Sequence, residues 1–144
     1  MNILIINGPN LNLLGVREPN IYGTETLNDI KIWIDTLDLA NAHTIKWYQS
    51  NHEGEIIDRL HEAMNDKTEG IIINPGALTH YSYAIRDAIT SIGIPVAEVH
   101  MSDINSREKF RRKSVIKDVC ITQISGLGKK GYAEALNALI KFIK

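Results

Sequence analysis

The feature that most constrains this chain is a regular alternation of short apolar runs with segments of helical periodicity. Runs rich in apolar, β-branched and aromatic residues predict five strands, at residues 3–6, 44–48, 71–73, 95–99 and 119–124. Apolar residues at helical spacing predict helices over residues 26–37, 54–65, 79–92, 107–113 and 130–142. This alternation is typical of a parallel sheet that has helices on both faces.

Right-handed crossovers leave few ways to arrange five parallel strands. We predict an α/β fold, a flavodoxin-like three-layer sandwich with strand order 2-1-3-4-5. The chain has 144 residues without repeats, linkers or low-complexity tracts, so we expect one domain over residues 1–144. In such sheets, ligands bind beyond the carboxyl ends of the strands, near the point where the strand order reverses. The loops after the first, third and fourth strands are therefore where we expect a site.

Composition argues against several classes of protein. The 16 Lys and Arg residues are balanced by 17 Asp and Glu, whereas a general nucleic-acid binder usually carries a positive excess. A lone cysteine, Cys120, forms no internal disulfide and no cysteine-based zinc cage. We expect His43, His52 and His61 on the surface and no metal site. Without a long apolar run or a secretory signal, we expect a cytoplasmic protein with no nucleic-acid or membrane partner.

The segment between the first strand and the first helix, residues 8–23, is unusually long for a βα loop. It contains Asn10, and it places Arg17 five residues before Tyr22. In a functional interpretation the loop is a lid that brings Arg17 and Tyr22 to a pocket, where the guanidinium favours the phenolate form of the tyrosine. In a structural interpretation Arg17 lies on the surface and Tyr22 packs to hold the loop in place.

The fourth strand ends in an acid–base pair, Glu98 and His100, which are two residues apart and share one face of the strand. A carboxylate beside an imidazole fixes its tautomer and suits a general acid. The alternative is an ion-paired histidine at a strand end. Met101 and Ser102 then begin a loop whose backbone N–H groups are suited to an anion.

Further polar residues follow the third strand and precede the fifth. Asn74 follows the third strand, and Thr79 and His80 open the next helix. The start of a helix attracts anions, so His80 is a candidate ligand-binding residue; the alternative is that it only caps or packs there. Asp87, about two helical turns further on, resembles an ordinary surface acid. Arg107 and Arg111 share a face of a predicted helix, where they bind a carboxylate or pair with a neighbouring glutamate.

Residues 126–131 match the pattern G-x-G-x-x-G but follow the last predicted strand. The dinucleotide fingerprint belongs to a first βαβ unit, with an acidic residue about 20 positions later on a second strand. We therefore reject dinucleotide binding and predict a tight turn into the final helix.

Taken together, the motifs run through nearly the whole chain in one order. They are Asn-Gly-Pro-Asn-Leu-Asn-Leu-Leu-Gly at 7–15, Arg-Glu-Pro at 17–19, Tyr-Gly at 22–23, Gln-Ser-Asn at 49–51, Asn-Pro-Gly-Ala at 74–77, Thr-His at 79–80, Arg-Asp at 86–87, Glu-Val-His at 98–100, Ser at 102, Arg-Glu at 107–108 and Phe-Arg at 110–111. This set resembles the type II 3-dehydroquinate dehydratases.

The resemblance implies an enzyme, a hydro-lyase that eliminates water in trans from 3-dehydroquinate. The product is 3-dehydroshikimate, and the reaction is reversible and passes through an enolate. It implies a place in the shikimate pathway of aromatic amino acid biosynthesis or in quinate breakdown. It also implies a flavodoxin-like fold, no metal or organic cofactor, and a homododecamer of four trimers.

Position by position, the resemblance also implies roles for individual residues. Tyr22 is the base that removes the C2 proton, and Arg17 stabilises its tyrosinate and the transition state. His100 is the acid that protonates the departing C1 hydroxyl, supported by Glu98, while Asn10 holds a water against the enolate. Implied substrate-binding residues are Asn74, His80, Met101, Ser102, Arg107 and Arg111, and Asp87 is implied to reach a neighbouring subunit's site.

Two positions beside the predicted carboxylate-binding loop differ from the family pattern. Asp103 stands where the family commonly has Asn, and Asn105 where it often has His. A charge on Asp103 that points into the site would weaken anion binding.

Two other classes are weighed against the enzyme: a flavodoxin-like module that binds FMN or carries a receiver phosphorylation site, and a catalytically inactive structural oligomer. A receiver is disfavoured by Asn-Gly-Pro after the first strand and by Asn74 after the third. A flavin module is disfavoured because the first loop lacks a Ser/Thr-rich phosphate cradle. An inactive oligomer is disfavoured because Tyr22, Arg17 and His100 are all present.

Overall fold

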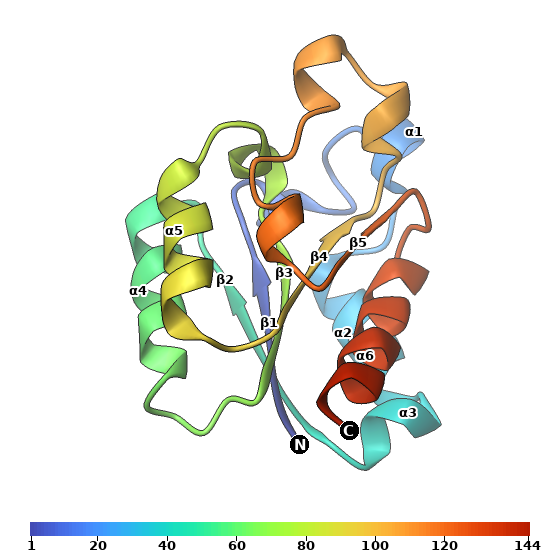
Figure 1. The fold of residues 1–144 in the computed structure, drawn as a ribbon. Coiled ribbons are helices and arrows are strands. Elements are labelled where there is room, and N and C mark those ends of the chain that lie inside the picture. Colours follow the sequence, from blue (N-terminus) through green and yellow to red (C-terminus); the bar gives the residue numbers. More distant parts are fainter.

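The computed structural model describes residues 1–144, and it places a five-stranded sheet between two layers of helices (Figure 1). The strands are β1 (Asn2–Asn7), β2 (Thr44–Gln49), β3 (Gly70–Asn74), β4 (Val96–His100) and β5 (Thr122–Ser125). Every neighbouring pair is parallel, and the order is β2-β1-β3-β4-β5. The predicted fold class and strand order are confirmed.

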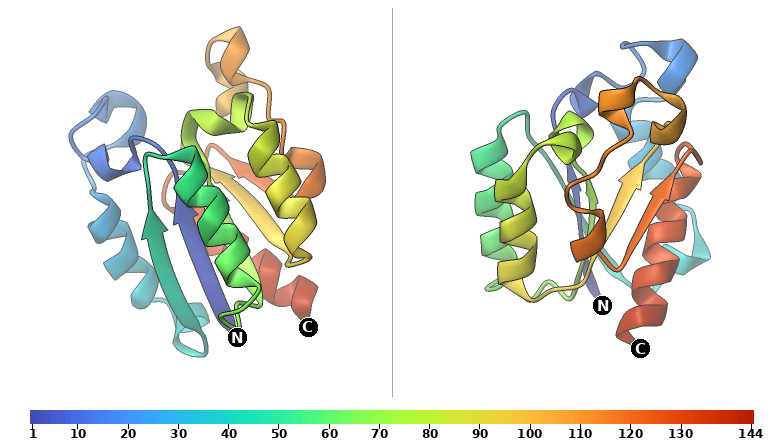
Figure 2. Two further views of the ribbon diagram at one scale, coloured as in Figure 1. Left: turned by 90° about the vertical axis from the view of Figure 1, so that its left-hand side faces the viewer. Right: turned by 45° about the horizontal axis from the view of Figure 1, so that its top comes forward.

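Helices cover both faces of the sheet, as Figures 1 and 2 show. One layer contains α2 (Leu27–Asp35), α3 (Asp38–Asn41) and α6 (Lys130–Ile143), and the other contains α4 (Glu53–Ala63) and α5 (Tyr83–Ile92). Because side chains alternate along a strand, Ile3 and Ile5 of β1 join the core under α6, whereas Leu4 and Ile6 join the core under α4 and α5. The sheet is therefore buried on both sides and serves as a rigid base for the loops at its carboxyl end.

The start of α2 follows its sequence signal. The Thr26 hydroxyl accepts from the Asp29 N–H at 3.1 Å, and the Asp29 carboxylate accepts from the Thr26 N–H at 2.9 Å, which completes a capping box. The observed helix is shorter than the one predicted over residues 26–37. It ends at Asp35, and α3 forms a separate turn after it.

The start of α5 differs from the prediction. The helix begins at Tyr83, where the Ser82 hydroxyl caps it by accepting from the Ile85 N–H at 3.0 Å. Residues Gly76–His80 form instead a 3-10 turn, η2. Thr79 does not cap a helix because its hydroxyl is bonded to the buried Glu98 carboxylate at 3.2 Å. The prediction that His80 opens a helix is therefore wrong.

The predicted helix over residues 107–113 and the early start of the last strand are also wrong. That region contains only the 3-10 turns η3 (Ile104–Ser106), η4 (Lys109–Arg111) and η5 (Lys117–Val119), and β5 begins at Thr122. A polar segment with little apolar periodicity has no face to bury, so nothing favours a longer helix. Two short elements in the long first loop, η1 (Leu11–Leu13) and α1 (Pro19–Tyr22), were not predicted.

The loops that follow β1, β3 and β4 lie together at one end of the sheet, while both chain termini lie at the other end (Figures 1 and 2). None of the helices is both long enough and apolar enough to cross a bilayer.

Candidate active site

A pocket opens at the carboxyl end of β1, β3 and β4, the place that the strand order indicates. It is lined by Pro9, Asn10, Leu11, Arg17, Tyr22, Asn74, Gly76, Ala77, His80, His100, Met101, Ser102, Ile104, Arg107 and Arg111. Ten of the twelve residues predicted for the site lie in this lining. Glu98 lies beneath the pocket in contact with His100, and only Asp87 lies elsewhere.

The floor of the pocket depends on two glycines that let the ends of β1 and β3 approach each other. A Cβ on Gly8 would lie 2.5 Å from the Pro75 carbonyl oxygen, and a Cβ on Gly76 would lie 3.0 Å from the Pro9 oxygen. Gly76 also has a φ of +59°, in the left-handed region that favours glycine. The Asn-Gly-Pro and Asn-Pro-Gly motifs are thus explained by close packing of two loops.

Asn10 is held at the mouth of the pocket by its backbone. Its N–H donates to the Asn51 side-chain oxygen at 2.9 Å, and its φ of 69° turns the chain into η1. The Gln49 amide donates to the Gly8 carbonyl at 3.2 Å and to Asn51 at 3.1 Å, so the end of β2 supports this turn. The Asn10 side chain remains available to a ligand.

Asn74 is oriented from below by Tyr132 of α6, which is completely buried. The Asn74 amide donates to the Tyr132 hydroxyl at 3.1 Å, and that hydroxyl donates to the Asn7 side-chain oxygen at 2.6 Å. Burial raises the pKa of Tyr132, so this hydroxyl stays protonated and acts only as a hydrogen-bond link.

Tyr22 meets two guanidinium groups. Arg107 Nη1 donates to the Tyr22 hydroxyl at 3.1 Å and to the Ser102 hydroxyl at 3.2 Å. Arg17 lies over the ring, with Cζ 5.2 Å from the centroid, and pairs with Glu18 at 3.4 Å. The direct contact with the phenol oxygen therefore comes from Arg107, which the resemblance assigned to substrate binding.

The Glu98–His100 pair lies on β4 with almost no exposure, 0% for Glu98 and 5% for His100. His100 Nε2 lies 2.8 Å from Glu98 Oε2, so the carboxylate accepts the Nε2 proton and Nδ1 is the nitrogen left for a ligand. Burial alone would raise the pKa of Glu98, but hydrogen bonds from His100, Ser114 and Gln123 outweigh burial and hold this pKa below its usual value.

His80 and Arg111 also line the pocket. His80 Nδ1 lies 2.7 Å from the Lys113 carbonyl, and its ring meets Phe110 edge-on at 6.3 Å. Burial lowers the pKa of His80, so the ring is neutral at pH 7. Arg111 pairs with Glu108 at 2.8 Å, which holds its guanidinium at the pocket.

Two acids lie outside the pocket of this chain. The Asp103 carboxylate is exposed and accepts from the Asn105 N–H at 3.0 Å, so its charge caps η3 and does not point at the pocket. Asp87 is exposed on α5 and does not line the pocket.

Sequence reasoning missed the residues that support the site from below: Thr79, Ser114, Gln123 and Tyr132. One signal was available for Gln123, a polar residue inside a predicted strand that pairs in register with Glu98. Ser114 carried no comparable signal because it lies outside the predicted strands and helices, and Tyr132 lies in the last predicted helix, where an aromatic residue is typical of the core.

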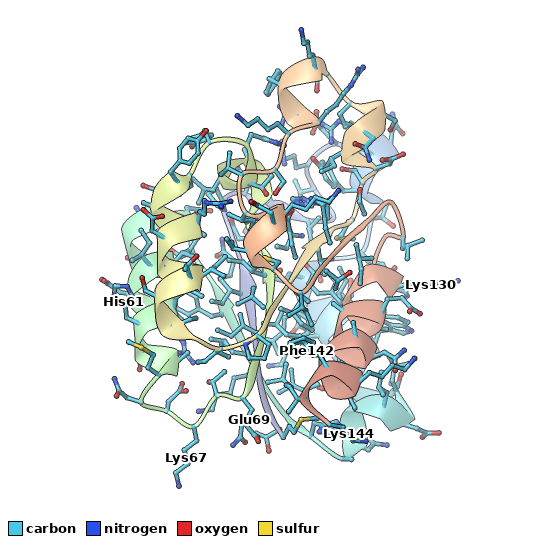
Figure 3. The ribbon with its side chains drawn as sticks, viewed as in Figure 1. His61, Lys67, Glu69, Lys130, Phe142 and Lys144 are labelled. Carbon is cyan, nitrogen blue, oxygen red and sulfur yellow. The ribbon has the colours of Figure 1, made fainter.

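No group of three His, Cys, Asp or Glu side chains is placed to hold a metal ion. His61 is exposed on the outer side of α4 (Figure 3) and does not line the pocket.

Fold and site together define a flavodoxin-like α/β protein with an acid–base pocket at the carboxyl edge of its sheet. The family model of class II dehydroquinases matches residues 1–140. The chain is 56% identical over 138 residues to a 3-dehydroquinate dehydratase of Caldicellulosiruptor saccharolyticus, which covers 95% of this chain and 94% of that protein. The chain belongs to the class II dehydroquinase family, and the resemblance seen in its motifs is confirmed.

Solved structures agree with this assignment. The crystal structure of the type II dehydroquinase from Butyrivibrio crossotus is similar with a TM-score of 0.94 and 52% identity over 97% of both chains. That from Propionibacterium acnes is similar with a TM-score of 0.89 and 39% identity, over 97% of this chain and 96% of that one.

Proposed function

We propose that this chain is a hydro-lyase that converts 3-dehydroquinate reversibly to 3-dehydroshikimate through an enolate. The observation that carries the proposal is one pocket that joins a tyrosine bonded to arginine with a histidine bonded to a buried carboxylate. A proton next to a ketone is removed through an enolate, so such a reaction needs a base, an acid and stabilisation of negative charge. The family and the names of the relatives support the substrate.

Tyr22 is the proposed base. As tyrosinate it takes the C2 proton, and the positive charges of Arg107 and Arg17 stabilise the tyrosinate beforehand. Arg107 acts at the phenol oxygen and Arg17 over the ring, so the two arginines stabilise the same charge from different sides.

His100 is the proposed acid. As an imidazolium it gives the Nδ1 proton to the C1 hydroxyl as the C–O bond breaks, so that water leaves and the electron pair of that bond stays on its oxygen. The Glu98 carboxylate at Nε2 stabilises the imidazolium before this transfer. A protonated leaving group is needed because hydroxide is expelled with difficulty.

The remaining polar residues of the pocket bind and orient the substrate. Asn74, His80, Arg111 and the Met101–Ser102 backbone surround the space between Tyr22 and His100 and would hold the hydroxyl and carboxylate groups. Asn10 would hold a water against the enolate. The proposed reaction needs no metal or organic cofactor.

We also propose assembly into trimers, and of four trimers into a dodecamer. Asp87 and Tyr83 are four residues apart on the outer face of α5, and Tyr81 and Phe110 are also exposed on this side of the molecule. Exposed aromatic side chains of this kind favour a subunit interface, and an interface here would bring Asp87 to a neighbouring pocket.

The test is to mix the purified protein with 3-dehydroquinate and follow the ultraviolet absorbance of the conjugated product. A catalytic rise that survives EDTA supports the proposal, including its independence of metal. No rise with a folded, assembled protein would overturn it.

A further inference from the structure

The Glu98 carboxylate is surrounded by neutral donors that none of the roles above includes. Ser114 Oγ donates to Oε1 at 2.6 Å, and Gln123 Nε2 donates to Oε2 at 2.6 Å. Thr79 Oγ1 lies 3.2 Å from Oε2. A buried charge is costly unless hydrogen bonds replace its hydration, and here three neutral side chains supply them in addition to His100.

The direction of the Ser114 hydrogen bond follows from its other partners. Ser114 Oγ accepts from the Ile116 N–H at 3.3 Å and from the Lys117 N–H at 3.1 Å. Thr79 Oγ1 also lies 3.0 Å from Ser114 Oγ, but the carboxylate is the closer acceptor at 2.6 Å, so the Ser114 hydrogen is donated to Glu98. Ser114 therefore donates a hydrogen bond to the buried Glu98 carboxylate and also holds the backbone that follows η4.

The position of Gln123 follows from the sheet. In the parallel pairing of β4 and β5, Glu98 is the register partner of Gln123, so both side chains leave the same face. The amide nitrogen must face the carboxylate, because a carbonyl oxygen at 2.6 Å from a carboxylate oxygen would be repelled.

Resting on the function proposed above, we propose that Ser114 and Gln123 are positioning residues for the reaction. They keep Glu98 ionised and aimed at His100 Nε2, so that His100 Nδ1 is the nitrogen that exchanges a proton with the substrate. When Nδ1 gives up its proton, the imidazolium becomes a neutral imidazole whose remaining proton is on Nε2, bonded to Glu98. If Glu98 itself took up a proton, the imidazolium would lose the charge that stabilises it.

The titratable groups that face Glu98 are few. His100 comes from β4, His80 from η2 and Cys120 from the segment before β5, with Arg111 beyond His80. Burial lowers the pKa of His80 and raises the pKa of Cys120 to about 12, so both are neutral near pH 7. Tyr22, the proposed base, also contributes an acidic limb because it acts as tyrosinate, but Ser114 and Gln123 do not contact it. A shift of the acidic limb in the test variants relative to the wild type therefore reports the Glu98–His100 pair.

The experiment compares Ser114→Ala and Gln123→Leu with the wild-type enzyme. The readouts are kcat and KM for 3-dehydroquinate, the pH profile of kcat, and the rate of deuterium exchange at C2 relative to dehydration. Ser114→Thr is the conservative variant, which retains the hydroxyl. Thr122→Val is the matched control, since Thr122 is next to Gln123 on β5 but faces the groove along α6.

We expect both test variants to lower kcat roughly tenfold to a hundredfold, the range expected for one hydrogen bond to a charged group. KM stays within about twofold, because neither side chain lines the pocket. The acidic limb moves to higher pH, because Glu98 is protonated more easily after losing a donor. In both test variants the rate of C2 exchange falls less than the rate of dehydration. Ser114→Thr keeps a kcat close to that of the wild type because it retains the hydroxyl. Thr122→Val matches the wild type in all readouts.

The proposal is overturned if both test variants leave the acidic limb and the ratio of exchange to dehydration unchanged. It is also overturned if dehydration and exchange fall in parallel with thermal stability, since that pattern marks a purely structural role. Failure of the function proposed above is distinguishable, because the wild-type enzyme would then show no dehydration at all.

Discussion

The two chemical ends of the pocket are built in opposite ways. Tyr22 lies on a four-residue helix in a long loop whose side chains are mostly exposed, and it depends on an arginine 85 residues away. His100 ends a fully buried strand, above a carboxylate bonded to four side chains. Exposed loops with few buried contacts open at low free-energy cost, whereas buried strands do not.

This difference assigns separate tasks to the two ends. The end that holds His100, the proposed acid, is preorganised by the sheet and is called the acid end. The end that holds Tyr22, the proposed base, is called the base end, and it is suited to open for the substrate and to form when the loop closes. Substitutions at the base end should therefore change activity with little change in stability. Substitutions beneath the acid end should change both.

The largest expected effect is that of Tyr22→Phe. Loss of the phenol oxygen removes the proposed base, so kcat for dehydration should fall by a factor of about 10³–10⁴. Tyr22 is only half-buried, so the thermal unfolding midpoint should stay within a few degrees of wild type. The measurement is the ultraviolet assay together with circular dichroism melting.

Tyr48→Phe, on β2 and outside the pocket, is the matched control for loss of a phenol oxygen. Turnover of Tyr22→Phe close to that of this control would remove Tyr22 from the role of base.

The next effect is that of His100→Ala, which tests the acid end alone. Dehydration should fall by a factor of about 10²–10⁴, while Tyr22 continues to exchange the C2 proton with solvent. Deuterium incorporation into unreacted 3-dehydroquinate, followed by NMR, measures the exchange. His61→Ala on the outer side of α4 serves as the control. Equal loss of exchange and dehydration would contradict the division between the two ends.

A smaller effect is expected for Tyr132→Phe, which tests the hydrogen bonds that orient Asn74 beneath the pocket. The hydroxyl donates to Asn7 and accepts from Asn74 in a fully buried site. Its removal should lower the free energy of unfolding by about 1–3 kcal/mol, since two buried polar groups lose a partner. KM should rise more than kcat falls, because Asn74 lines the substrate pocket.

Urea unfolding and steady-state kinetics check the Tyr132→Phe prediction. Tyr48→Phe removes a hydroxyl that lies outside both the pocket and the proposed interface, and it should leave stability unchanged. Unchanged stability in Tyr132→Phe would mean that its hydrogen bonds contribute nothing net.

The same contrast explains how far the sequence alone leads. The runs Ile3–Ile6 of β1 and Ile71–Ile73 of β3 are short, buried and purely apolar, and handedness then leaves few strand orders. The fold and the edge that holds the site were therefore predictable. Glu98 and His100 could be paired because strand periodicity places them on one face. Residue chemistry suggested a general acid at His100 and a phenolate at Tyr22, and the resemblance of the motifs supplied the particular proton transfers.

The rest depends on contacts that no local pattern encodes. Arg107 was placed on a helix that does not form, because residues 104–119 make only 3-10 turns and their side chains are fixed by tertiary partners. Thr79 was placed at a helix start, yet its hydroxyl is bonded to Glu98. Ser114 and Gln123 reach the same carboxylate from 16 and 25 residues away.

The smallest effect is expected for Asp103→Asn, which restores the residue common in the family. Sequence position alone places this charge beside the carboxylate-binding loop, but in the structure it accepts from the Asn105 N–H and is exposed. Solvent screens an exposed charge, and an asparagine oxygen keeps the same cap. The kcat/KM of Asp103→Asn for 3-dehydroquinate should therefore lie within about twofold of the wild-type value, at low salt as well as at moderate salt. If the kcat/KM of Asp103→Asn exceeded that of the wild type by more than this at low salt, Asp103 would be shown to repel the substrate.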